Sequence, residues 1–152
     1  MRVKLQHILQ GIEMQSDETC SYLNLNTGEI VYVSQEALSI ADEGEYEGLP
    51  EWQQAEVKIA FDIIDSIDKY VELPSQFEMN DYKIMERFCY SLSDVKIQDK
   101  LLHAIRGKGA FRRFKNIIDQ IGLTKQWYEY RDVKYKEIAI AFCKLNSIDY
   151  IE

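Results

Sequence analysis

The sequence has few of the residues from which catalytic and metal sites are commonly built. Its 152 residues include only two histidines, His7 and His103, and three cysteines. None of them falls in a metal-binding spacing such as CxxC or HExxH, and the GxSxG, P-loop and GxGxxG patterns are missing. We therefore expect no cofactor and no metal, identify no catalytic residue, and consider enzymatic activity uncertain, with binding favoured over chemistry.

Long apolar runs are missing as well. No stretch approaches the roughly 18 apolar residues of a membrane-spanning helix, and the first residues contain no apolar signal-peptide core. The cysteines, at positions 20, 89 and 143, are odd in number and widely spaced, which suggests neither a disulfide framework nor a zinc site. We expect a cytoplasmic protein with reduced thiols and no association with a membrane.

Apolar residues make up 46% of the chain and aromatic residues 12%, which excludes a disordered protein. A length of 152 residues suits one domain with a sizeable core, so we expect a single domain over residues 1–152. The two prolines and seven glycines mark breaks between elements rather than low-complexity tracts.

Apolar spacing and turn residues predict an α+β protein that is mostly helical. An N-terminal helix over 3–14 precedes a small antiparallel β-hairpin, with strands at 20–25 and 29–34 and a turn that needs Gly28 for its positive φ. The acidic stretch 41–52 has the composition of a loop. The predicted helices that follow cover 50–70, 80–92, 94–107, 109–121 and a long segment from Thr124. A strand at 148–151 could extend the hairpin.

Charge is unevenly distributed along the chain, whose net charge is -8. Residues 96–115 contain seven Lys or Arg against Asp99 alone, which makes this segment +6 and the remainder -14. The overall acidity disfavours indiscriminate binding to nucleic acid, because long-range repulsion opposes approach to phosphate. A local basic site is still compatible with this pattern.

The most basic stretch, RGKGAFRRFK at 106–115, lies at a predicted junction between two helices. Unpaired backbone amides at the start of the second helix favour the binding of an anion there. Phe111 and Phe114, three residues apart, are expected to face the core and to leave the neighbouring cations exposed. The predicted binding residues are Arg106, Lys108, Gly109, Arg112, Arg113 and Lys115.

Three interpretations of this junction stay open. Its charges could pair with acidic residues of the same chain, such as Asp119 or Glu137. They could dock an acidic surface of a protein partner, which is the function we favour, because the planar guanidinium of Arg binds carboxylates bidentately. They could also hold RNA or DNA phosphate, with Trp127 or Tyr128 available for base stacking. A hydrolase that uses unidentified acidic residues ranks third among the functions.

Three stretches, EMQSDETCSYLNLNTGEIVYVSQE, AIRGKGAFRRFK and WYEYRDVKYKEIAIAFCKLNSI, resemble a bacterial group known as uncharacterised protein family 0158. The resemblance covers nearly the whole chain, and GKGAFRRFK at 107–115 is its most specific part. It implies a bacterial, cytosolic, single-domain protein. It implies no activity, cofactor or catalytic residue.

Overall fold

The computed structural model describes residues 1–44 and 47–152. It confirms the expected α+β class, with many helices and small sheets. Contacts divide the chain into two compact units: a sheet unit of residues 1–78 and 139–152, and a helical unit of residues 79–138. None of the helices within the described ranges combines the length and the hydropathy needed to cross a membrane.

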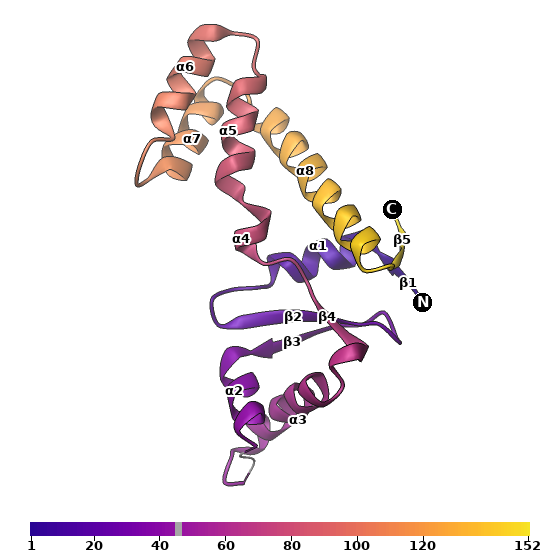
Figure 1. Cartoon of the computed structure of the whole chain (residues 1–152). Coiled ribbons are helices and arrows are strands. Elements are labelled where there is room, and N and C mark those ends of the chain that lie inside the picture. The colour runs from indigo at the N-terminus through magenta and orange to yellow at the C-terminus, as the bar shows by residue number, and fades with distance from the viewer. Residues whose placement is uncertain (45–46) are drawn as a thin grey trace. The chain divides into compact units, whose positions relative to one another are not determined.

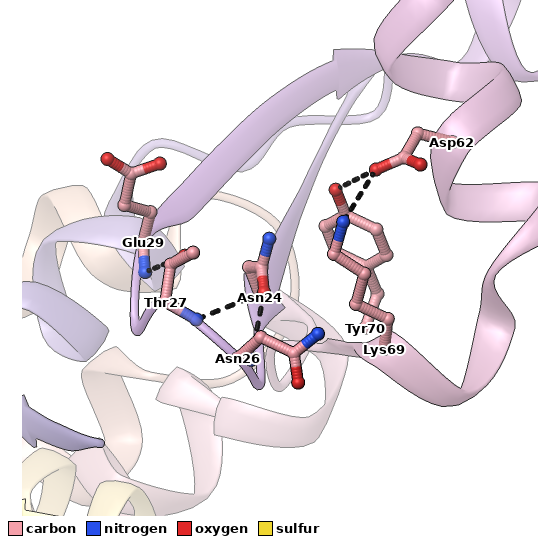
Figure 2. A network of polar contacts seen from close by, with 7 residues as sticks. All are labelled: Asn24, Asn26, Thr27, Glu29, Asp62, Lys69 and Tyr70. Carbon is pink, nitrogen blue, oxygen red and sulfur yellow. Dashed lines mark hydrogen bonds and ion pairs between the residues drawn. The ribbon is translucent and has the colours of Figure 1, made fainter.

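The predicted hairpin forms the centre of the sheet unit. Strand β2 (Thr19–Asn24) pairs antiparallel with β3 (Ile30–Ser34) on one side and with β4 (Tyr70–Glu72) on the other. In the turn, the Asn24 side chain accepts hydrogen bonds from the amides of Asn26 and Thr27 at 2.9 and 3.2 Å (Figure 2). Gly28 has the expected positive φ. Side-chain bonds thus support the turn that sets the register of the two strands.

Helices cover both faces of this sheet (Figure 1). On one face, the Ser21 hydroxyl donates to the Gly11 carbonyl of α1 (Leu5–Glu13) at 2.7 Å. The other face packs against α2 (Gln35–Glu43) and α3 (Glu51–Asp65). The buried cluster on that face consists of Cys20, Val33, Ala37, Ala41, Val57, Ala60 and Ile63. Successive residues of β2 point to opposite faces, so this one strand serves both layers.

Both ends of the chain differ from the prediction. The first apolar residues form a short strand, β1 (Arg2–Lys4), before α1 begins. Strand β5 (Asp149–Ile151) does form near the predicted C-terminal position, but it pairs in parallel with β1 and not with the hairpin. The residue pattern of a three-residue strand does not specify which strand it pairs with. That depends on which strand the folded chain places next to it.

The region between the hairpin and the helical unit also differs. Helix α2 was not predicted, although Ser34 caps it by accepting from the amide of Ala37 at 3.0 Å. The predicted loop 41–52 overlaps its last turn, and residues 45–46 of that loop lie outside the described residues. The predicted helix 50–70 is too long, because α3 ends at Asp65 and a 3₁₀ turn leads into β4. Strand pairing with β2 overrides the helical spacing there.

The helical unit begins at Met79, the last residue of α4 (Gln76–Met79), and is close to the prediction. It contains α5 (Asp81–Ser91), α6 (Val95–Ala104), α7 (Ala110–Gln120) and the part of α8 (Thr124–Leu145) up to Ile138. Asn80, the first residue of the predicted helix 80–92, caps α5 by accepting from the Lys83 amide at 3.2 Å. Asp94 caps α6 by accepting from the backbone amides of Lys96 and Ile97.

An aromatic cluster fills the interior of the helical unit. Phe88 makes edge-to-face contacts with Phe114, Trp127 and Tyr130, at centroid distances of 6.0, 5.3 and 5.4 Å. Trp127 is 4% exposed, so the idea that it could stack on a base is wrong. Edge-to-face pairs of this kind add about 1 kcal/mol each beyond the area they bury. They provide a rigid base for α7 and for the connection that precedes it.

Candidate functional site

Most of the basic residues belong to the helical unit. It contains 13 Lys or Arg against 8 Asp or Glu, a net charge of +5, whereas the sheet unit has 5 against 18, a net charge of -13. The charge asymmetry seen along the sequence is therefore also an asymmetry between two compact parts of the molecule. A surface of the helical unit can attract anions although the whole chain is acidic.

Four of the 13 Lys or Arg side chains of the helical unit line one groove. This groove, of about 590 Å³, is lined by Lys100, His103, Ala104, Arg106, Lys108, Arg113 and Ile117. We call it the basic groove. Its lining includes no Asp or Glu, while five of its seven residues carry a basic side chain. Residues from α6, from the α6–α7 connection and from α7 meet here, which gives it the charge expected of an anion-binding surface.

Arg113 holds the α6–α7 connection in place. Its guanidinium donates from Nε to the carbonyl of Ala104 at 2.7 Å, from Nη1 to that of Lys108 at 2.6 Å and from Nη2 to that of Arg106 at 2.6 Å. These carbonyls include one from the end of α6, where backbone acceptors lack helical partners. The bonds fix the shape of the connection, and Arg113 forms no ion pair with a carboxylate of the helical unit.

Two glycines allow the connection to turn this tightly. Gly107 and Gly109 have φ values of +70° and +79°, in the left-handed region that disfavours other residues. Gly109 is the N-cap of α7, and a β-carbon there would lie 2.8 Å from Nη1 of Arg113. The Gly109 position therefore needs glycine both for its backbone and to make room for the guanidinium.

The basic segment forms no ion pairs within the helical unit. Both ion pairs of this unit join residues of α8, at 3.9 and 3.5 Å, and none of the seven Lys or Arg of 96–115 takes part in one. Glu137, one of the acids considered for internal pairing, is bonded to Lys134. Asp119, the other, forms no ion pair within the unit. The charges of the basic groove therefore have no acidic partner in their own unit.

Phe111 does not face the core, contrary to the expectation. It is 40% exposed, because α7 turns Ala110, Phe114 and Ile118 inward instead. Its neighbour one turn on, Lys115, lines a second pocket of about 270 Å³ together with Tyr128 of α8. Tyr128 is 44% exposed. Two aromatic side chains therefore remain accessible on the same unit as the basic groove.

The six predicted binding residues occupy four different kinds of position in this geometry. Arg106, Lys108 and Arg113 line the basic groove, and Gly109 shapes its connection. Lys115 lines the second pocket, and Arg112 is exposed on α7 outside both cavities. The prediction missed Lys100 and His103, whose spacing of three residues on a helix that ends at the junction was the available signal. Ligand binding by these residues stays a prediction.

The cysteines do not have the properties of catalytic nucleophiles. Cys20, Cys89 and Cys143 are all free and buried. Burial raises the pKa of Cys89 to about 11, and it also raises the pKa values of Cys20 and Cys143. These thiols are therefore protonated at neutral pH, whereas a reactive cysteine needs its thiolate. Among the described residues, no group of three His, Cys, Asp or Glu side chains is arranged to hold a metal ion.

The fold and this surface define an α+β protein that presents a basic groove on a helical unit. The chain belongs to the uncharacterised protein family UPF0158, whose model matches residues 1–152. This confirms the resemblance drawn from the three sequence stretches. No curated protein and no solved structure matches the chain.

Proposed function

We propose that this protein is a cytoplasmic interaction module that binds an acidic surface of a partner protein through the basic groove. The observation that carries the proposal is the convergence of five basic side chains on a groove that no carboxylate lines. Cations held together without carboxylate partners in their own unit can exchange water for the carboxylates of a second protein at little cost in reorganisation.

The surroundings of the groove favour a protein as the partner. Protein interfaces combine charge with apolar anchors, and Arg and aromatic residues contribute strongly to them. Ile117 lines the groove itself, and Phe111 is exposed on the same helix. Arg113 is already bonded to three carbonyls, so Lys100, Arg106 and Lys108 are the cations available to meet carboxylates directly.

A second candidate function is binding to single-stranded nucleic acid. The observation that favours it is that Lys115 and the exposed Tyr128 line one pocket, since a cation can hold phosphate where an aromatic ring stacks a base. In this case Tyr128 contributes to affinity. If the basic groove docks a protein, Tyr128 plays no part.

The test is an affinity purification from a lysate of cells that carry the gene, with and without nuclease. The variant is Lys100→Glu/Lys108→Glu, which reverses two charges of the groove. The matched control is Lys83→Glu/Arg87→Glu, the same charge change on exposed residues of α5 that do not line the groove. Arg113 is unsuitable for charge reversal because its loss would also disturb the connection.

The proposal predicts that wild type captures a partner protein even after nuclease treatment. The groove variant should fail to capture this partner, and the control variant should capture it. The purified partner should then bind wild type directly, with an affinity that falls as salt is added. Loss of the partner with both variants would reject the groove as the site. If nuclease abolished the capture and Tyr128→Ala weakened it, nucleic-acid binding would replace this proposal.

A further inference from the structure

The sheet unit has a second surface suited to a partner, on the outer face of α3. Trp52 is 70% exposed there and Ile59 is 39% exposed, and the small, exposed Ala55 lies between them. The three residues have the spacing i, i+3 and i+7, which places them along one stripe of the helix. We call this stripe the α3 outer face.

This stripe is not part of the core of the sheet unit. The inward side of α3 is formed by Val57, Ala60 and Ile63, which pack in the buried cluster between the sheet and helices α2 and α3. Single exposed apolar residues are common on proteins and need no explanation. A tryptophan and an isoleucine aligned two turns apart, with a small residue between them, have the form of a helix-packing surface into which a partner side chain can fit.

The chain segment that contains the stripe is acidic. Residues 35–65 contain nine Asp or Glu against Lys58 alone. Four of these acids, Asp42, Glu43, Glu47 and Glu51, are exposed and take part in none of the ion pairs among the described residues. Glu51 is adjacent to Trp52 in α3. A basic flank on a partner helix would therefore find carboxylates in this segment that form no ion pair among the described residues.

We propose that the α3 outer face docks an amphipathic helix of a partner protein, rich in Lys or Arg. Its apolar side would cover Trp52, Ala55 and Ile59, and its basic flank would meet the carboxylates of Asp42, Glu43, Glu47 and Glu51. Helix-in-groove recognition commonly combines such apolar anchors with flanking charge. Nucleic acid and anionic membranes are disfavoured because the same carboxylates repel them.

A second copy of the chain is a less suitable occupant. Its most basic amphipathic helix is α7. The apolar side of α7, formed by Ala110, Phe114 and Ile118, is already buried in its own helical unit. The exposed side of α7 offers Phe111 but no apolar stripe to match that of α3. This docking surface lies in a different unit from the basic groove, so the two proposals stand or fall separately.

The test uses the full chain and a synthetic helical peptide with leucines along one side and lysines along the other. A peptide of the same composition in scrambled order, which has no apolar side, is the control ligand. Affinity is measured by calorimetry for wild type, Trp52→Ala and Ile59→Ser. Val133→Ser, which removes an apolar side chain that is 55% exposed in the helical unit, is the matched control variant.

We expect Trp52→Ala to weaken peptide binding about tenfold or more, as loss of an aromatic anchor does, and Ile59→Ser to weaken it less. Val133→Ser should bind as wild type does. Glu47→Gln/Glu51→Gln should lower the affinity for the peptide and the dependence of that affinity on salt. Glu13→Gln/Glu18→Gln, elsewhere in the sheet unit, should change neither quantity.

Three results would overturn the proposal. If the scrambled peptide bound as tightly as the amphipathic peptide, charge alone would explain the binding. Unchanged affinity in both Trp52→Ala and Ile59→Ser would place the peptide elsewhere. Self-association of the free protein in sedimentation, abolished by Trp52→Ala, would identify a second copy as the occupant.

Discussion

At the scale of single residues, two adjacent arginines of α7 have different roles. Arg113 donates to three backbone carbonyls, whereas Arg112 is exposed and does not line the groove. We expect Arg113→Ala to lower the free energy of unfolding by about 1.5–3 kcal/mol, the range for hydrogen bonds to a charged group. Arg112→Ala should change it by less than about 0.5 kcal/mol. Urea denaturation measures both.

Arg113→Lys provides a further comparison for this prediction. An ammonium group cannot reproduce the fork that reaches carbonyls of three residues, so this variant should lose most of the stability that Arg113→Ala loses. Equal stability of Arg113→Lys and wild type would mean that charge, and not the geometry of the guanidinium, stabilises the connection.

Asp62 of α3 predicts a dependence of stability on pH. Its carboxylate accepts hydrogen bonds from the Tyr70 hydroxyl at 2.5 Å and from Lys69 at 3.3 Å (Figure 2). The hydrogen bond from Tyr70, followed by Lys69, lowers the pKa of Asp62. A lowered pKa in the folded state contributes stability that is present above the carboxyl's unfolded pKa, about 3.9, and is lost as the pH falls through the folded value.

We therefore expect Asp62→Asn to destabilise the protein at neutral pH and to approach the stability of wild type below about pH 4. Urea midpoints measured across the acid range test this. Asp65→Asn, at an exposed position one turn further along the same helix, is the control and should follow wild type. A difference between Asp62→Asn and wild type that does not change with pH would argue against a linked protonation.

At the scale of elements, the α6–α7 connection depends on its glycines to different degrees. Gly107 and Gly109 both have positive φ, but only at Gly109 would a β-carbon meet the Arg113 guanidinium, at 2.8 Å. We expect Gly107→Ala to cost about 1 kcal/mol from the backbone alone. Gly109→Ala should cost more, because it also displaces Arg113. Thermal or urea unfolding of the two variants gives the comparison.

The double variant Gly109→Ala/Arg113→Ala separates the two contributions. If the collision with Arg113 causes the extra cost, the effects of the two substitutions should not add, since neighbours that share one interaction are coupled. Additive costs would mean that Gly109 matters only through its backbone conformation.

At the scale of the whole molecule, charge distribution should matter more than net charge. The chain has a sequence pI of about 4.9, yet its helical unit has a net charge of +5. We expect wild type to be retained on immobilised heparin, a polyanion, at low ionic strength, because the basic groove provides a local positive field. Lys100→Glu/Lys108→Glu should elute earlier than wild type. Equal loss of retention in Lys83→Glu/Arg87→Glu would assign the effect to overall charge and not to the groove.

Local signals predicted much of the fold. The Asn-Thr-Gly turn of the hairpin, the Asn80 cap and the glycines of the α6–α7 connection are each determined by neighbours in the chain, and the structure confirms them. Phe111 shows where local signals end. Its spacing from Phe114 suits a shared face, but the core selects the side of α7 that carries Ala110, Phe114 and Ile118.

By itself, the sequence determined the α+β class, most helix boundaries of the helical unit, the concentration of charge at 96–115 and the resemblance to the family. These features depend on composition, on periodicity and on residues close together in the chain. Only the tertiary structure decided that Lys100 and His103 share a groove with Arg106 and Lys108, and that Arg113 is bonded to the backbone. It also decided the partner of β5. Hydrogen bonds, strand pairing and electrostatic fields depend on distance through space, which spacing along the chain does not specify.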